Sequence, residues 1–170
     1  MAKADVAAQL ADAFKDLDCL MIDGTVEGYD SWEVATADQP ATPVADELEG
    51  QDMLYSSGTT GRPKGVRIPF VERPLGHPDS ILMLARDLYK MDTDTIYLSP
   101  APLYHAAPLR FNMSLLRMGG TSIIMEAFDA IEALRLIEKY HVTHAQWVPT
   151  MFVRMLKLPQ ADRDRFDVSS

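Results

Sequence analysis

The hydrophobic positions in the first third of the chain keep one clear period and then lose it. Four apolar side chains at helical spacing predict a helix over residues 4–17: Val6, Leu10, Phe14 and Leu17. The apolar run at residues 18–22 is typical of a short strand. Residues 23–50 are rich in Asp, Glu, Thr, Pro and Gly and have no sustained period, which predicts mostly loop, with a turn of helix within residues 31–37.

Beyond residue 50, short apolar runs alternate with longer amphipathic ones. The short runs predict strands at residues 52–57, 65–70, 95–99, 121–125 and 143–148. The amphipathic runs predict helices at residues 78–90, 109–118, 129–140 and 149–156. Asp129 and Glu132 have the spacing of a capping box, and Pro149 suits a first helical position. After Asp94 strand and helix alternate, which predicts an α/β fold with a mainly parallel sheet flanked by helices.

Composition narrows the functional classes. The chain has 170 residues and a net charge of −9, so it lacks the basic surface that nucleic-acid binding usually requires. Its single cysteine, Cys19, excludes an intrachain disulfide and fits a reducing compartment. The start of the chain does not have the pattern of a signal peptide, and the apolar runs are too short for a transmembrane segment. We therefore expect a cytoplasmic protein.

The segment YSSGTTGRPKGV, residues 55–66, is predicted to form a loop between two strands. Its glycines permit positive φ and a close approach of the backbone to an anion. The hydroxyl donors and the ammonium group suit phosphate: Ser56, Ser57, Thr59, Thr60 and Lys64. The segment does not match the P-loop of nucleotide hydrolases, because Lys64 follows Pro63 and Gly65 stands where a metal-binding hydroxyl is needed. The alternative is a plain polar hairpin loop.

The same segment resembles the signature loop of the adenylate-forming superfamily, which includes acyl-CoA synthetases. The segment LSPAPLYHAAPL, residues 98–109, resembles the second segment of that family. The run from Phe128 to Leu156 resembles the family's helix–strand–helix with a Val-Pro-Thr turn. The resemblance implies the large N-terminal domain of such an enzyme. Residues 1–50 then form a variable lead-in of helix, strand and loop. Residues 51–170 form a partial AMP-binding domain with the phosphate loop and the acyl-pocket segment.

The resemblance also implies a reaction. A carboxylic acid attacks ATP to give an acyl-adenylate, and coenzyme A then takes the acyl group, which makes the protein an acid–thiol ligase. The residues expected to bind the phosphates are Ser56, Ser57, Gly58, Thr59, Thr60, Gly61 and Lys64. Ser56 is the expected Mg²⁺ contact, and Lys64 and His105 are the expected catalytic residues. His105 corresponds to the family histidine beside the acyl carboxylate and favours a plain carboxylic acid over an amino acid.

Several alternatives stay open at this point. His105 fits equally a residue that caps the following helix, and Trp147 and Pro149 fit either the acyl pocket or the core. His141 and His144 lack a nearby third ligand, which disfavours a metal site. The chain departs from the family after the loop, at residues 68–80, and lacks the family's adenine-binding, ribose-binding and C-terminal segments.

We therefore expect an internal segment that is inactive alone and needs the remainder of its full-length chain. The other functions considered are a non-catalytic nucleotide- or phosphate-binding module and an adenylation domain of the peptide-synthetase type. The identity and chain length of the acid cannot be read from these residues.

Overall fold

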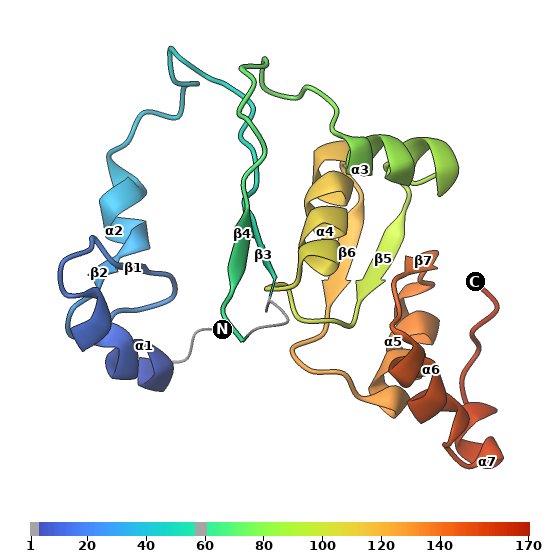
Figure 1. Cartoon of the computed structure of the whole chain (residues 1–170). Helices are drawn as coiled ribbons and strands as arrows, with labels where there is room; N and C mark the ends of the chain where they lie inside the picture. Colours follow the sequence, from blue (N-terminus) through green and yellow to red (C-terminus); the bar gives the residue numbers. More distant parts are fainter. Residues whose placement is uncertain (1–3, 57–60) are drawn as a thin grey trace. The chain divides into compact units, whose positions relative to one another are not determined.

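A computed structural model describes residues 4–56 and 61–170, which form two compact units, residues 1–47 and residues 48–170 (Figure 1). In the first unit the expected helix is divided. An α-helix, α1 (Ala4–Leu10), continues as a 3-10 turn, η1 (Ala11–Phe14). Two short parallel strands follow, β1 (Leu20–Met21) and β2 (Asp30–Ser31), and then α2 (Trp32–Ala37). The side chain of Ser31 accepts a hydrogen bond from the Val34 amide and caps α2, which confirms the helical turn expected there.

The second unit begins with an antiparallel hairpin of β3 (Leu54–Ser56) and β4 (Lys64–Val66). After it come α3 (Ser80–Met83), the π-helical segment η2 (Leu84–Leu88), β5 (Ile96–Ser99) and α4 (Ala106–Met118). The chain continues through β6 (Thr121–Ile124), α5 (Ala130–Tyr140), β7 (His144–Ala145) and α6 (Pro149–Leu156). A four-residue helix, α7 (Gln160–Arg163), follows α6.

Strands β6, β5 and β7 form a parallel sheet in that order, with β5 in the centre. Alternate side chains of β5 enter two separate cores because successive residues of a strand point to opposite faces. Leu98 packs with Ala133 and Leu136 of α5. Tyr97 packs with Leu115 of α4 and Ala85 of η2. Helices therefore cover both faces of this sheet, as the alternating pattern predicted.

A buried polar contact holds the sheet to α4. Asn112 of α4 is 4% exposed, and its amide nitrogen donates to the Ser99 hydroxyl at 2.8 Å and to the Pro108 carbonyl at 2.7 Å. The amide oxygen of Asn112 accepts from the Ser122 hydroxyl on β6. One side chain thus connects α4 with two strands and leaves none of its own polar atoms unpaired.

Strand β5 leads directly toward α4, which begins three residues earlier than expected, with His105 at its N-cap position. None of the helices in the described part of the chain is long and apolar enough to cross a membrane.

Candidate functional site

The two strands that flank the glycine-rich segment place two of the predicted residues opposite each other. Ser56 ends β3, Lys64 begins β4, and the two are register partners in the hairpin. Opposite residues of an antiparallel pair have Cβ atoms about 4.5–5.5 Å apart and share a face of the ladder. Both residues are exposed. A hydroxyl and an ammonium group therefore stand together where the chain enters and leaves the glycine-rich segment.

The structure explains why glycine occupies two positions of the segment. Gly61 has φ of +76°, a conformation that side-chain-bearing residues rarely adopt. Gly65 lies opposite Tyr55, and a Cβ on it would stand 3.1 Å from the tyrosine ring and closer still to the Met53 methyl group. The other predicted phosphate-binding residues lie outside the described residues: Ser57, Gly58, Thr59 and Thr60.

His105 lies beyond the carboxyl end of β5, where open α/β sheets place their ligands. It has extended backbone angles at the N-cap of α4, and its side chain makes no capping hydrogen bond. Its ring is tilted against the ring of Tyr104, with the centroids 4.5 Å apart. Both side chains are exposed, and Tyr104 keeps 82% of its accessible surface. The geometry therefore gives no support to a capping role and leaves the imidazole available to a ligand.

A cavity of about 300 Å³ opens on the α4 side of the sheet. Its lining comes from η2, β5, α4, β7 and α6 and the segments next to them: Tyr89, Met91, Tyr97, Phe111, His144, Ala145, Gln146, Trp147 and Phe152. Trp147 is half-buried, packs edge-on against Phe128 and is tilted against Phe152. Trp147, which fitted either an acyl pocket or the core, lines the cavity, whereas Pro149 is absent from the lining.

Sequence reasoning missed most of this lining. Tyr89 and Phe111 are 22 residues apart in the sequence, yet their rings pack at 5.9 Å between centroids. The available signal was the aromatic position on each amphipathic helix, but periodicity does not say which helices face each other across a sheet. His144 has a structural role, because its Nε2 donates to the distant Tyr89 carbonyl at 2.9 Å and its Nδ1 lies 2.9 Å from the Thr143 hydroxyl.

Tyr97 is the most enclosed polar side chain of the lining. It is 1% exposed, and its hydroxyl has no hydrogen-bond partner among the residues that the structure describes. Burial raises the pKa of Tyr97 to about 12, because the phenolate would lose its hydration. The group is therefore neutral at physiological pH.

Among residues 4–56 and 61–170 there is no cluster of three or more His, Cys, Asp or Glu side chains that could hold a metal ion.

Comparisons with known proteins found matches over most of this chain. A family model described as AMP-binding enzyme matches residues 2–170. The protein named 4-coumarate–CoA ligase-like 5, from Oryza sativa subsp. japonica, is 34% identical over 172 residues, which cover 95% of this chain and 31% of that protein. The protein named acetate/butyrate–CoA ligase AAE7, peroxisomal, from Arabidopsis thaliana, is 30% identical over 141 residues, which cover 82% of this chain and 24% of that protein.

A solved structure supports the same fold. The amide bond synthetase McbA from Marinactinospora thermotolerans matches with a TM-score of 0.66 at 21% identity, over 98% of this chain and 31% of that one. At that identity the likeness concerns the fold alone, and it confirms the expected helices around a mostly parallel sheet. This chain spans less than a third of the length of each of the three proteins.

Proposed function

Since the chain belongs to the family of AMP-binding enzymes, we propose that it is part of an ATP-dependent acid–thiol ligase. The enzyme would activate a carboxylic acid as its acyl-adenylate and transfer the acyl group to coenzyme A. The observation that carries the proposal is the pairing of Ser56 with Lys64 at the ends of the glycine-rich segment. The names of the Oryza and Arabidopsis relatives, both CoA ligases, support the reaction class.

In this proposal the hairpin end holds the polyphosphate of ATP. Attack of the carboxylate on the α-phosphorus breaks the bond to the β-phosphate, so negative charge builds on the departing pyrophosphate. The Lys64 ammonium, with the hydroxyls and main-chain amides of residues 56–61, would stabilise that charge. Lys64 is exposed at the start of β4, so its flexible stem can follow the pyrophosphate as it leaves.

Magnesium fits this donor set as a phosphate-bound ion. Ser56 supplies one exposed hydroxyl oxygen next to the proposed phosphate site, and Mg²⁺ commonly takes one or two protein ligands together with phosphate oxygens and water. When bound, the ion would neutralise part of the negative charge of the phosphates.

His105 is proposed to orient the acyl carboxylate. Its exposed imidazole stands at the carboxyl end of the parallel sheet and has no capping bond to give up. A donated N–H from the ring would hold one carboxylate oxygen and leave the other free to attack phosphorus.

The aromatic cavity is proposed to receive the acyl part of the substrate. Its volume of about 300 Å³ and its lining by the rings of Phe111, Trp147 and Phe152 favour a ring-bearing or medium-length apolar acid. The expectation of a plain carboxylic acid over an amino acid rests on His105 and stays a prediction, as does the cytoplasmic location.

The family segments that bind adenine and ribose, and its C-terminal segments, are proposed to lie in protein outside these 170 residues. An apolar stripe on α4 supports this proposal: Leu109, Met113 and Leu116 follow one another at helical spacing and are 38%, 53% and 63% exposed. Such a stripe on a helix is usually buried against another element.

The test is ATP–pyrophosphate exchange with radiolabelled pyrophosphate, measured on the natural gene product that carries this chain. We expect acid-dependent exchange that falls on the order of a hundredfold or more in Lys64→Ala, because one charge that stabilises the transition state is removed. Arg62→Ala is the matched control, since it removes a neighbouring cation that the mechanism does not use. ATP binding without exchange for any acid would favour a non-catalytic phosphate-binding module instead.

A further inference from the structure

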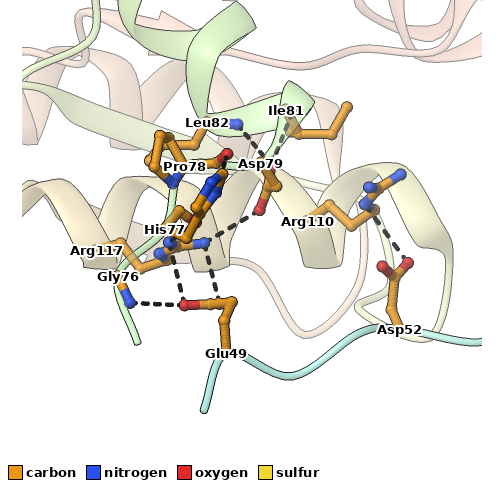
Figure 2. A network of polar contacts seen from close by, with 10 residues as sticks. All are labelled: Glu49, Asp52, Gly76, His77, Pro78, Asp79, Ile81, Leu82, Arg110 and Arg117. Atoms are coloured by element: carbon orange, nitrogen blue, oxygen red, sulfur yellow. Dashed lines mark hydrogen bonds and ion pairs between the residues drawn. The ribbon is translucent and has the colours of Figure 1, made fainter. Parts of the chain in front are cut away.

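Helix α4 carries His105 at its start and two arginines along one side, and both arginines reach the segments that flank the hairpin (Figure 2). Arg110 and Arg117 are seven residues apart, two helical turns, so they lie on the same face of α4. The Nε atom of Arg110 lies 3.5 Å from a carboxylate oxygen of Asp52, two residues before β3. The helix that presents His105 thus also contacts residues 49–52 and 77–79, the segments before and after the hairpin, which we call the hairpin stems.

Arg117 makes the more extensive set of contacts. Its guanidinium lies 3.4 Å from both carboxylate oxygens of Glu49 and 3.1 Å from a carboxylate oxygen of Asp79, and it donates to the His77 carbonyl at 2.8 Å. Glu49 lies before the hairpin, whereas His77 and Asp79 lie after it. One planar group therefore joins the incoming and outgoing chain, a role suited to the fixed fork of arginine donors.

Each partner of Arg117 is itself fixed by the backbone. A carboxylate oxygen of Glu49 accepts from the Gly76 amide at 2.7 Å, and the Glu49 amide donates to the Arg73 carbonyl at 2.9 Å. Asp79 caps α3 by accepting from the amides of Ile81 and Leu82. The side chains of Arg117 and Glu49 are only 25% and 23% exposed, so solvent screens their attraction less than it would at an open surface.

We propose that Arg117 is a positioning residue for the glycine-rich segment, which sets Ser56 and Lys64 at a fixed distance from His105. The proposal rests on the proposed function. From residue 105 to residue 117 the helix extends roughly 18 Å, at about 1.5 Å per residue. It forms a rigid link between the histidine and the hairpin stems. Arg117 touches no reacting atom in this scheme and acts only through Glu49, His77 and Asp79.

The kinetic test compares Arg117→Met, Arg117→Lys and Glu49→Gln in the natural gene product. Loss of the fork should raise KM for ATP and lower kcat/KM for ATP roughly tenfold to a hundredfold, while KM for the acid stays within about twofold. Arg117→Lys should recover part of the loss, because the ammonium keeps the charge but not the fork. Glu49→Gln combined with Arg117→Met should cost less than the sum of the two, since they remove one shared contact.

Arg135→Met is the matched control. Arg135 also projects from a helix and pairs with a carboxylate, Glu132 at 2.6 Å, but on α5, away from the hairpin contacts. We expect its kinetics to equal those of the unchanged protein. A drop in Arg117→Met that only follows the folded fraction, measured by circular dichroism, would overturn the positioning role.

A second measurement does not depend on activity. In the 170-residue chain, Arg117→Met should speed backbone hydrogen exchange at residues 49, 76 and 77 and at the β4 amides 64–66 on the order of tenfold, and leave the β5–β6 amides protected. Equal exchange in Arg117→Met and Arg135→Met would overturn the inference whether or not the enzyme is active. If the unchanged gene product shows no pyrophosphate exchange, the proposed function fails, and the hydrogen-exchange comparison still decides whether Arg117 holds the stems.

Discussion

At the scale of single residues, some polar side chains are bonded within the fold and others are exposed and proposed to bind ligands. Asn112, Arg117 and His144 each have hydrogen bonds to other parts of the fold. Lys64 and His105 are exposed, and His105 makes no capping bond. Tyr97 fits neither group, because it is buried with its hydroxyl unpaired among the described residues.

Replacing Tyr97 by phenylalanine removes an unsatisfied polar atom and keeps the ring. We expect Tyr97→Phe to keep the free energy of unfolding or raise it by up to about 1 kcal/mol, whereas Tyr97→Ala should lower it by about 3–5 kcal/mol through the cavity it leaves. Urea unfolding at neutral pH gives both values. In an alkaline titration followed by ultraviolet absorbance, Tyr97→Phe should remove the ionisation near pH 12. A loss above 1 kcal/mol in Tyr97→Phe would show that the hydroxyl has a partner.

The carboxyl group of Glu132 makes the free energy of unfolding depend on pH. The ion-paired Arg135 side chain lowers the pKa of Glu132 below its ordinary value of 4.5. A carboxyl group with a lowered folded-state pKa stabilises the fold above the ordinary pKa and loses that contribution as the pH falls through the folded-state pKa. Glu132→Gln should therefore have a lower urea midpoint than the unchanged chain at pH 7, and the difference should vanish toward pH 2. A difference that stays constant down to pH 2 would contradict this attribution.

The starts of helices were predictable where a capping residue or a proline sets them. Asp129 caps α5 through the Glu132 amide, and Pro149 begins α6, as the sequence indicated. The return bond of the capping box was not confirmed, because the Glu132 carboxylate bonds to Arg135 instead. Strand β7 is two residues long instead of six, and in the sheet it pairs with β5. Apolar periodicity gives the existence of a strand, but its length depends on its neighbours.

Helix ends were less predictable. Three helical segments end in the left-handed conformation, at Lys90, Gly119 and His141, with φ of +58°, +85° and +50°. Glycine signals such an ending, whereas lysine and histidine do not. The amides that follow complete the caps: Met91 donates to the Ala85 carbonyl, and Val142 to the Ile137 carbonyl. The prediction of a continuous helix at residues 78–90 also missed the π-helical segment η2. One added residue within a turn hardly alters the apolar pattern of the sequence.

His141→Gly tests the cost of that ending on α5. Glycine adopts a φ of +50° without the clash that a Cβ creates, so we expect the free energy of unfolding to rise by about 0.5–1 kcal/mol. Thermal or urea unfolding measures the change. Lys139→Gly is the control, since it places glycine inside the last turn of the same helix, where it should lower stability by about 1 kcal/mol. A loss of stability in His141→Gly would mean that the imidazole contributes more than the backbone strain costs.

For the whole molecule, the sequence motifs indicated Ser56, Lys64 and His105 as candidate residues, but they did not indicate the cavity. The lining combines residues from 89 to 152, and their proximity follows from the order of strands and the packing of helices on the sheet. The contacts of Arg117 were equally hidden, since Glu49 is 68 residues away in the sequence. Candidate residues that lie together in one motif could be proposed from the sequence, whereas contacts between distant segments could not.

The apolar stripe on α4 gives a prediction at this scale. Leu116 is 63% exposed, so Leu116→Glu in the 170-residue chain should change the free energy of unfolding by less than about 0.5 kcal/mol. In the natural gene product the same change should cost more than about 2 kcal/mol if further protein covers the stripe, because a carboxylate would be buried without a partner. Urea unfolding of both proteins makes the comparison. Equal small effects in both would argue against coverage of α4 at this position.

The network around Arg117 also sets a condition for chimeric enzymes. A hairpin transplanted from a relative is placed beside Arg117 of α4. The Arg117 guanidinium binds carboxylates at positions 49 and 79 and the carbonyl at position 77. A graft of residues 53–66 alone keeps those partners, whereas a longer graft replaces them and leaves Arg117 facing foreign side chains. The ion pairs of Arg110 and Arg117 therefore set the boundaries of an exchangeable module in this protein, and those boundaries enclose the whole glycine-rich motif.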